Sequence, residues 1–379
     1  MSDVVVVGAG IVGAACAYHL ARAGARVTVL ERGTVAGGTS SAGEGNILVS
    51  DKPPGPELDL ALWSRRLWND IGADLGARSI ELEAKGGLVV ATDPAEQAQL
   101  VALAGRQRDA GVAATDLAPD ELADYEPFLA GDLAGGAYFP QDAQVQPMLA
   151  TAHLLRGLDV RCHSEVREIE TGPTGVVAGV RTGDGTLVPA TTVVNATGVA
   201  GGELAATTGT RLPVEPRRGF ILVTEPLSDD RGRRPIRHKV YTAGYAGAVA
   251  SDDAGLQTAA VIEGTRAGTV LIGSSRERRG FDEAYPMPVL RRLAAQARRL
   301  FPFLAHARVL RAFHGFRPLT PDHLPVIGPD KRTAGLWHAC GHEGAGIGLA
   351  PATGALVTAL VTGAAPEVDP APFDPGRFA

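Results

Sequence analysis

The first thirty or so residues combine two short apolar runs with one helical pattern. Residues 4–7 are consecutive valines, a run typical of a strand buried on both faces of a parallel sheet. Residues 11–23 place apolar side chains at helical spacing and stop before Gly24, a residue type that favours helix ends. Residues 26–30 form a second apolar strand, with Glu31 at its carboxyl end. The pattern predicts one complete βαβ unit.

The middle of the chain changes pattern more than once. Residues 57–129 show mainly helical patterns separated by loops, including a stretch at 94–110, and a strand is expected near 136–139. A buried strand over 192–198 ends in small residues. Between these lie short strands joined in part by a Gly-Asp-Gly turn, predicted at 160–169, 175–181 and 186–189.

From about residue 214 onward the pattern is that of a second sheet. A helix with arginines on its outward face is expected over 289–300, and the tail over 336–362 reads as a strand, a glycine-rich turn and a helix. The apolar runs that predict antiparallel strands of this sheet are 220–223, 259–263 and 270–273.

The turn between the first strand and the helix carries a dinucleotide motif. Gly8 permits a tight turn, Gly10 lets the backbone approach a pyrophosphate, and Gly13 allows helix and strand to pack closely. The helix start offers N–H donors and a positive dipole, and Glu31 follows at the distance expected for a residue that binds the adenosine ribose. The motif therefore predicts an adenine dinucleotide site, the alternative being a glycine-rich structural turn.

The residues after Glu31 bear on which dinucleotide is bound. The chain continues with Arg32 and Gly33 and then a glycine-, threonine- and serine-rich loop at 38–41, unlike a typical NAD-dependent dehydrogenase. Only one complete fingerprint is present, so a second domain for NAD(P)H is not expected. These features favour FAD, with electrons leaving to oxygen, a quinone or a partner protein.

The predicted fold class is α/β, with a Rossmann-like FAD-binding domain interleaved with an α+β substrate domain on a mainly antiparallel sheet. Segments of the two domains alternate along the chain. We expect the FAD-binding domain to comprise residues 1–51, 140–213 and 317–379, and the substrate domain residues 52–139 and 214–316.

Composition and charge exclude several classes of partner. The chain has 36 Lys and Arg against 42 Asp and Glu, a net charge of −6, so no nucleic-acid partner is expected. A local basic run is interpreted as a solvated loop: Arg231, Arg233, Arg234, Arg237 and Lys239.

The three cysteines, Cys16, Cys162 and Cys340, lie far apart without ligand spacing, so no metal site is expected. With no signal peptide or membrane span in the pattern, we expect a cytoplasmic protein.

Five motifs in this order resemble those of the D-amino-acid-oxidase superfamily of flavoproteins, which includes glycine oxidase, sarcosine oxidase and D-amino-acid dehydrogenase. Within that family, residues 43–52 and 273–277 are most similar to the β subunits of hetero-oligomeric D-hydroxyproline, L-proline and opine dehydrogenases. The five motifs are the glycine fingerprint with Glu31 and Arg32, and residues 38–41, 193–198, 315–328 and 340–351.

The resemblance implies which residues contact FAD. The cysteine that tethers flavin in monomeric sarcosine oxidase is replaced by Gly315, so FAD is expected to be non-covalent. The lysine that those oxidases carry in the last glycine-rich loop is also absent from this chain, which argues against simple sarcosine oxidation. Val166 is an expected adenine-side contact, or else an ordinary strand residue. The full set is Gly8, Gly10, Ile11, Val12, Gly13, Glu31, Arg32, Thr39, Ser40, Glu44, Gly45, Asn46, Val166, Ala196, Thr197, Gly198, Gly341, Gly344, Gly346 and Ile347.

The implied activity is oxidation of the C–N bond of a small amino or imino acid by hydride transfer to flavin N5. D-hydroxyproline, proline, sarcosine, glycine or an opine-like compound are the candidate substrates. Arg317 is expected to grip the substrate carboxylate, the alternative being a structural salt bridge. His342 and Glu343 lie in the loop before the last helix and could contact flavin, substrate, solvent or another subunit, and Tyr245 and Lys52 are further pocket candidates.

Two other functions remain open at this point. The chain could be a flavin-bearing structural or electron-relay subunit of a multi-subunit dehydrogenase, with the substrate site on another chain. It could also be a flavin monooxygenase, although residues 320–322 read Thr-Pro-Asp where that class needs Gly-Asp. A hetero-oligomer with electron-transfer subunits is the expected partnership if the electrons do not pass to oxygen.

Overall fold

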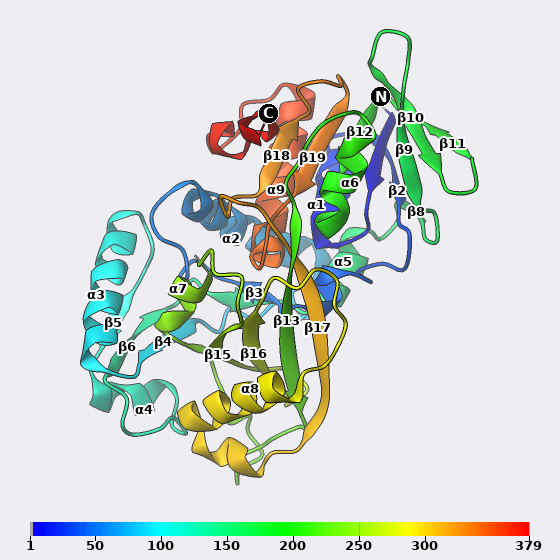
Figure 1. The fold of residues 1–379 in the computed structure, drawn as a ribbon. Helices are drawn as coiled ribbons and strands as arrows, with labels where there is room; N and C mark the ends of the chain where they lie inside the picture. Colours follow the sequence, from blue (N-terminus) through cyan, green and yellow to red (C-terminus); the bar gives the residue numbers. More distant parts are fainter. Residues whose placement is uncertain (1–2, 250, 379) are drawn as a thin grey trace.

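The computed structural model describes residues 3–249 and 251–378, and two large sheets dominate it (Figure 1). In the view of Figure 1 the smaller sheet lies above and the larger one below. Residues 1–2, 250 and 379, which belong to the predicted domain segments, lie outside the described residues.

The upper sheet has six strands and is parallel except at one edge. Its central strand is the valine run, and all four valines are buried, as expected for a strand covered on both faces. This confirms the predicted α/β class with a Rossmann-like βαβ start. The order is β18 (Val326–Pro329), β19 (Leu336–Cys340), β12 (Thr192–Asn195), β1 (Asp3–Val7), β2 (Arg26–Leu30) and β8 (Asp159–Arg161), with β18 antiparallel to β19.

Helices α1 (Ile11–Arg22) and α9 (Gly346–Thr362) pack closely against each other beside this sheet. A Cβ on Gly354 would lie 2.5 Å from the carbonyl oxygen of Ala15, so a side chain there would force the two helices apart. Helices α2 (Pro56–Leu75) and α5 (Pro147–Leu154) complete this layer. The contact places the starts of α1 and α9 near one another.

Two small sheets connect to the upper layer. The first is antiparallel, in the order β11 (Leu187–Pro189), β10 (Val177–Thr182) and β9 (Val166–Thr171), and it projects at the upper right of Figure 1. The predicted strand over 160–169 is therefore wrong, because the chain makes a turn there and divides it between β8 and β9 in different sheets. The second pairs β3 (Asn46–Ile47) with β7 (Ala143–Gln144).

The lower sheet has eight strands and is antiparallel except between β14 and β4. The predicted antiparallel second sheet is thus confirmed. Its strands, in order, are β17 (Val309–Leu319), β13 (Glu215–Thr224), β16 (Val270–Arg276), β15 (Gln257–Gly264), β14 (Lys239–Thr242), β4 (Gly87–Ala91), β6 (Gly135–Phe139) and β5 (Thr115–Leu117).

The prediction for residues 57–129 missed strands β4 and β5. All five residues of β4 are buried, so the strand has no polar face and no alternation to mark it. Its first residue, Gly87, lies against Asp142, where an added Cβ would come within 2.2 Å of the carboxylate. A short apolar run between two helices does not reveal its secondary structure without the neighbouring strands.

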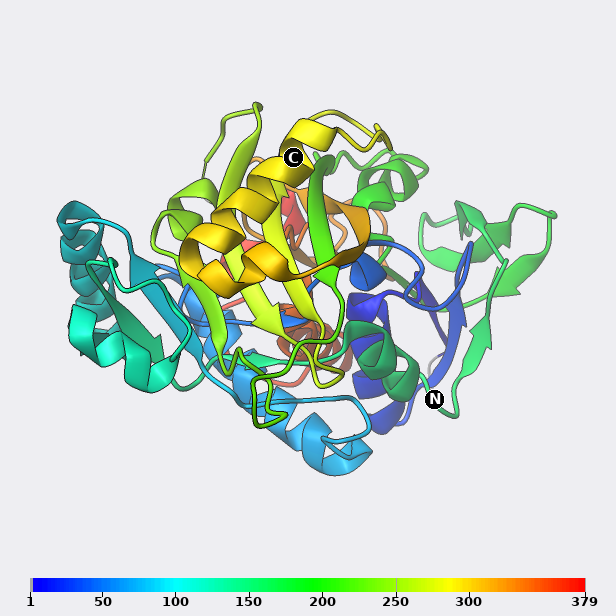
Figure 2. The ribbon, with the colours of Figure 1, turned by 90° about the horizontal axis from the view of Figure 1, so that it is seen from below.

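Helix α8 (Met287–Leu300) covers one face of the lower sheet, as Figure 2 shows from below. It buries Val289, Leu293 and Leu300 on the sheet and turns its arginines outward, as predicted. Helix α3 (Pro94–Asp109) is capped by Asp93, whose carboxylate accepts hydrogen bonds from two backbone N–H groups of the first turn. The remaining helices are α4 (Leu122–Tyr125), α6 (Gly201–Ala206) and α7 (Gly244–Val249).

Candidate active site

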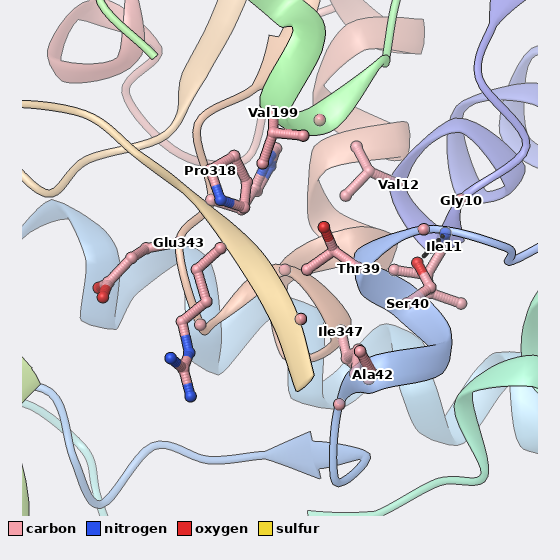
Figure 3. Close-up of a pocket in the computed structure, with 18 of the residues that line it drawn as sticks. Gly10, Ile11, Val12, Thr39, Ser40, Ala42, Val199, Pro318, Glu343 and Ile347 are labelled. Carbon is pink, nitrogen blue, oxygen red and sulfur yellow. Dashed lines mark hydrogen bonds between the residues drawn. The ribbon is translucent and has the colours of Figure 1, made fainter. Parts of the chain in front are cut away.

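A cavity of about 410 Å³ contains most of the predicted site residues and is lined from both large sheets (Figure 3). In Figure 3, Ile11 and Ser40 lie on one side of the cavity and Glu343 on the other. The predicted residues that line it are Gly8, Gly10, Ile11, Val12, Glu31, Arg32, Thr39, Ser40, Glu44, Asn46, Ala196, Thr197, Gly198, Tyr245, Arg317, His342, Glu343, Gly344, Gly346 and Ile347.

One end of the cavity is the turn between β1 and α1. Gly8 has φ +107°, and a Cβ on Gly13 would lie only 2.0 Å from the Gly8 carbonyl oxygen. Side chains at these two positions are therefore excluded by the packing of the turn on the helix. The Ile11 N–H in the first turn of α1 donates to Ser40 Oγ at 2.9 Å, drawn as a dashed line in Figure 3.

Glu31 is held at the same end by backbone donors. Its Oε2 accepts from Ala9 N–H at 2.9 Å and its Oε1 from Gly33 N–H at 2.8 Å. A fixed carboxylate beside a glycine turn and a helix N-terminus is the donor and acceptor set that a ribose and a pyrophosphate require. The residues present therefore fit the adenosine diphosphate part of FAD, which they would hold.

The middle of the cavity lies between the 3₁₀ helix η1 (Thr39–Ala42), β17 and the start of α9. Thr39 Oγ1 donates to the Phe316 carbonyl oxygen at 2.7 Å, which joins η1 to β17. Glycines face each wall: a Cβ on Gly315 would lie 2.5 Å from Ala42 Cβ, and one on Gly43 would lie 2.7 Å from Ile347 Cδ1. The walls touch at these positions, so only glycine fits there.

Several lining residues were not among the predicted site residues. Those from the 33–43 loop come directly after the motif, so its glycine and serine content was a usable signal. Those from β13 and β16 come from a distant sheet and carry no local signal. The complete set is Gly33, Thr34, Gly37, Gly38, Ala42, Gly43, Val199, Gly219, Ile221, Ser274, Gly315, Pro318, Ala339 and Cys340.

Five predicted site residues lie outside the lining of this cavity. Gly13, Gly45 and Gly341 instead permit close packing: a Cβ on Gly45 would lie 1.9 Å from the Val145 carbonyl oxygen, and one on Gly341 would lie 2.6 Å from a Thr320 methyl carbon. The two others are Val166 and Lys52.

Val166 lines a neighbouring cavity of about 250 Å³ that also includes Glu31 and Arg32. Lys52 is buried, and its ammonium donates to the Leu48 carbonyl oxygen at 3.2 Å and to Asp51 Oδ1 at 2.7 Å. The structure therefore brings Val166 next to the nucleotide end but places Lys52 behind the cavity wall.

Arg317 lies at the other end of the cavity, on β17. Its Nη1 donates to the Ser275 carbonyl oxygen at 3.0 Å. Burial and the nearby Arg276 lower the pKa of the Arg317 guanidinium to about 10, so it is still charged at neutral pH. No ion pair within 4.0 Å to Arg317 is formed among the described residues. A partly buried cation that lines a cavity and lacks a carboxylate partner is suited to an anionic ligand.

Glu343 balances part of this positive charge. Its Oε1 lies 2.8 Å from Arg217 Nη1 and 3.9 Å from Arg276 Nε, and its Oε2 lies 3.9 Å from His323 Nδ1. Burial alone would raise the pKa of Glu343, but the nearby His323 imidazole and the positive charges of Arg276, Arg217 and Arg317 lower it to about 2. Glu343 is therefore an anion at neutral pH.

His342 and Tyr245 are buried at the same end of the cavity. His342 Nε2 lies 2.9 Å from Thr353 Oγ1, and burial lowers the pKa of the ring to about 3, so the ring is neutral. The Arg276 guanidinium lies over the Tyr245 ring, 4.6 Å from its centroid.

The interpretation of the basic run as a solvated loop is wrong for Lys239. This residue lies on β14 with 1% of its side chain exposed, and its ammonium is 2.9 Å from Glu44 Oε2 and 3.2 Å from Glu263 Oε2. A lysine in a charge run was expected in solvent, but two buried carboxylates that are distant in sequence pair with it.

Membrane-spanning and metal-binding features are both absent from the described ranges 3–249 and 251–378. Within them, no helix has both the length and the apolar character needed to cross a membrane. The same ranges contain no group of three or more His, Cys, Asp or Glu side chains placed to hold a metal ion.

Comparisons with known proteins agree with this geometry. The model of the DAO family, described as FAD dependent oxidoreductase, matches residues 3–360. Glycine oxidase of Pseudomonas putida is 32% identical over 99% of both chains. Among solved structures, glycine oxidase from Geobacillus kaustophilus is 30% identical with a TM-score of 0.86 over 98% of each chain. L-proline dehydrogenase from P. horikoshii is 25% identical with a TM-score of 0.88, over 100% of this chain and 97% of that one. The chain therefore belongs to the DAO family of FAD-dependent oxidoreductases and is an enzyme of the amino-acid-oxidising type.

Proposed function

We propose that this enzyme oxidises the C–N bond of a small amino or imino acid whose carboxylate is bound by Arg317. The observation that carries the proposal is the position of Arg317. It is a partly buried cation that lines the same cavity as the dinucleotide turn and has no carboxylate partner within 4.0 Å among the described residues. A ligand with a carboxylate would supply the missing negative charge.

Bound FAD supplies the electron acceptor for hydride removal from the carbon next to the nitrogen. The residues of the chain have to position the substrate and exclude water. The bond from Arg317 to the Ser275 carbonyl oxygen fixes the guanidinium, so a carboxylate held by it has a defined direction. Neutral His342 and the apolar Ile221 and Ile347 add no competing charge to the wall of the cavity.

The names of the relatives indicate the range of substrates to test. Glycine is a primary amine and L-proline a secondary amine, and enzymes named for each resemble this chain over nearly its whole length. We therefore propose a small α-amino or α-imino acid and a screen of glycine, sarcosine, D-amino acids, the prolines, hydroxyprolines and opines. Bleaching of the flavin by one of them under anaerobic conditions would support the proposal.

The electron acceptor and any partner subunits are part of the same test. We propose that the chain holds its own substrate site, because Arg317, Tyr245 and Glu343 all line the cavity. The purified chain alone should then reduce an artificial dye with the substrate. If no amino acid bleaches the flavin of the isolated chain, the alternative of an electron-relay subunit gains support, and NADPH-dependent bleaching would favour a monooxygenase.

Substitution of Arg317 tests the proposed role directly. Arg317→Ala should raise the KM for substrate by roughly 100-fold or more, because a charge-assisted pair is lost, while the flavin spectrum is retained. The KM of Arg317→Lys should lie between those of the wild type and Arg317→Ala, since lysine keeps the charge but lacks the paired N–H donors of the guanidinium. Arg65→Lys is the matched control, a buried arginine outside the cavity that bonds to the Gln141 carbonyl oxygen. Equal kinetics in all three variants would exclude the role.

A further inference from the structure

The carboxylate of Glu44 is an unusual feature of the substrate end of the cavity. Glu44 is 7% exposed and lines the cavity. Its Oε2 accepts from Lys239 Nζ at 2.9 Å and from Asn46 Nδ2 at 3.0 Å. Its Oε1 is buried and has no hydrogen-bond partner among the described residues. A buried carboxylate oxygen without a donor is costly, so a donor from a ligand would be strongly favoured.

The surrounding residues hold the Glu44 carboxylate in place. Burial alone would lower the pKa of Lys239, but the carboxylates of Glu263 and Glu44 more than offset this effect and raise it. Lys239 is therefore a permanent cation beside Oε2. Lys85 is in turn 3.2 Å from Glu263, so two lysines face two carboxylates in this cluster. The cluster positions Glu44 without using its second oxygen.

The backbone opposite Oε1 makes space for the carboxylate. A Cβ on Gly273 would lie 2.1 Å from Glu44 Oε1, so only glycine allows this approach. The next residue, Ser274, lines the cavity, and the neighbouring Ser275 carbonyl oxygen holds Arg317. Glu44 and Arg317 are close enough that the carboxylate raises the pKa of the guanidinium, against the larger lowering by burial.

We propose that Glu44 Oε1 accepts a hydrogen bond from the nitrogen of the substrate while Arg317 binds its carboxylate. The inference rests on the proposed function and adds the group that recognises the amine. An α-amino acid carries its nitrogen and its carboxylate on the same carbon, and Glu44 and Arg317 offer an acceptor and a cation to the same cavity. Glu44, which the sequence assigned to cofactor contact, is then a residue that orients the reacting C–N bond.

The first experiment uses the FAD-loaded enzyme with pairs of ligands that differ only at the nitrogen. Sarcosine and methoxyacetate have the same shape, as do proline and tetrahydro-2-furoate, but an ether oxygen donates no hydrogen bond. Dissociation constants are measured anaerobically from the flavin absorbance. The amine of the responding pair should bind roughly 10- to 100-fold more tightly than its ether, the effect of one hydrogen bond to a charged group. Equal affinities would overturn the proposal without any variant.

The second experiment compares two isosteric variants. Glu44→Gln should weaken binding of the amine by the same roughly 10- to 100-fold factor and leave binding of the ether unchanged. Glu126→Gln is the matched control: Glu126 is also fully buried, accepts from His238 N–H at 2.6 Å, and has one oxygen without a partner among the described residues, but it lies outside the cavity. Its ligand affinities should match those of the wild type.

The outcomes separate this inference from the proposed function. If Glu44→Gln weakens amine and ether equally, or loses flavin while the wild type binds both ligands alike, Glu44 is a cofactor or structural contact and the inference is wrong. In that case Arg317→Ala still weakens both ligands, and the proposed function stands. If no amine or ether of either pair perturbs the flavin, and Arg317→Ala changes nothing, the proposed function itself has failed.

Discussion

The two ends of the cavity are built in different ways. The nucleotide end consists mainly of backbone and glycines from residues 8–43, with Ala196, Thr197 and Gly198 beside them, and Glu31 is held by two backbone N–H groups. The substrate end consists of charged side chains from β13, β14, β16, β17 and the loops before β3 and α9. The backbone geometry of the glycine turn is determined by neighbouring residues in the sequence. The paired charges form only when strands that are distant in the sequence come together in the fold. The two ends should therefore respond differently to substitution.

The largest expected effect is at the nucleotide end. Gly13→Val should abolish FAD binding and the stable fold, because even a Cβ would lie 2.0 Å from the Gly8 carbonyl oxygen. The protein should be colourless and show no cooperative unfolding transition. Gly10→Val is the matched variant, since its Cβ would meet only Ser40 Oγ, at 3.2 Å. It should fold normally but bind FAD weakly. Yellow, stable Gly13→Val protein would contradict the packing argument.

A smaller but still severe effect is expected at the substrate end. Glu343→Gln should lower the free energy of unfolding by about 3–5 kcal/mol, because Arg217 and Arg276 lose their buried anion. Urea denaturation of the flavin-loaded enzyme measures this change. Glu367→Gln is the control, because Glu367 pairs with Arg66 on the surface and such pairs contribute less than about 1 kcal/mol. Similar values for the two variants would show that the buried cluster adds no stability.

The pH dependence of this contribution results from the lowered pKa of Glu343. Since its pKa falls from the ordinary 4.5 to about 2, the contribution is present above pH 4.5 and is lost as pH falls towards 2. The stability difference between wild type and Glu343→Gln should therefore shrink through that window. A difference that stays constant down to pH 2 would contradict the ionised state assigned to Glu343.

The fold could be predicted from the sequence where the pattern of neighbouring residues alone determines the secondary structure. In the valine run, the glycine turn and the amphipathic helix α8, the residue types themselves indicate which positions are buried. The prediction missed strand β4 because this strand is buried on both faces and shows no alternation. The prediction of one strand over residues 160–169 was wrong because a turn divides these residues between two sheets. Both errors concern pairing partners that are distant in the chain.

The site divides in the same way. Gly8, Gly10 and Glu31 could be assigned from spacing, and Arg317 from a family motif. Arg217, Lys239 and Arg276 could not, because nothing in a single strand shows that its charge will face a carboxylate from another segment. Lys239 in particular stands in a run of arginines that otherwise belongs to the surface. The charge pairs at the substrate end are a tertiary property.

A further prediction concerns His342 and tests whether water reaches the substrate end of the cavity. Burial lowers its pKa from 6.5 to about 3, so the unfolded chain binds a proton that the folded enzyme does not. Stability should therefore fall as pH drops below 6.5, by about 2 kcal/mol at pH 5 from this group alone. His342→Gln should remove that part of the slope, and buried His19 contributes equally to both proteins. Parallel stability curves would show that the ring is protonated or hydrated.

The smallest effect is expected from a side-chain substitution at the nucleotide end that leaves the backbone turn intact. Glu31→Gln keeps the shape and one acceptor oxygen, so the Ala9 N–H or the Gly33 N–H retains its partner. The loss of a charged acceptor for the ribose should raise the Kd for FAD by roughly tenfold, about 1.4 kcal/mol. Flavin titration of the apoprotein measures it, with Glu168→Gln, exposed on β9, as the control. A loss of binding as complete as in Gly13→Val would mean that the carboxylate, and not the glycine turn, determines nucleotide binding.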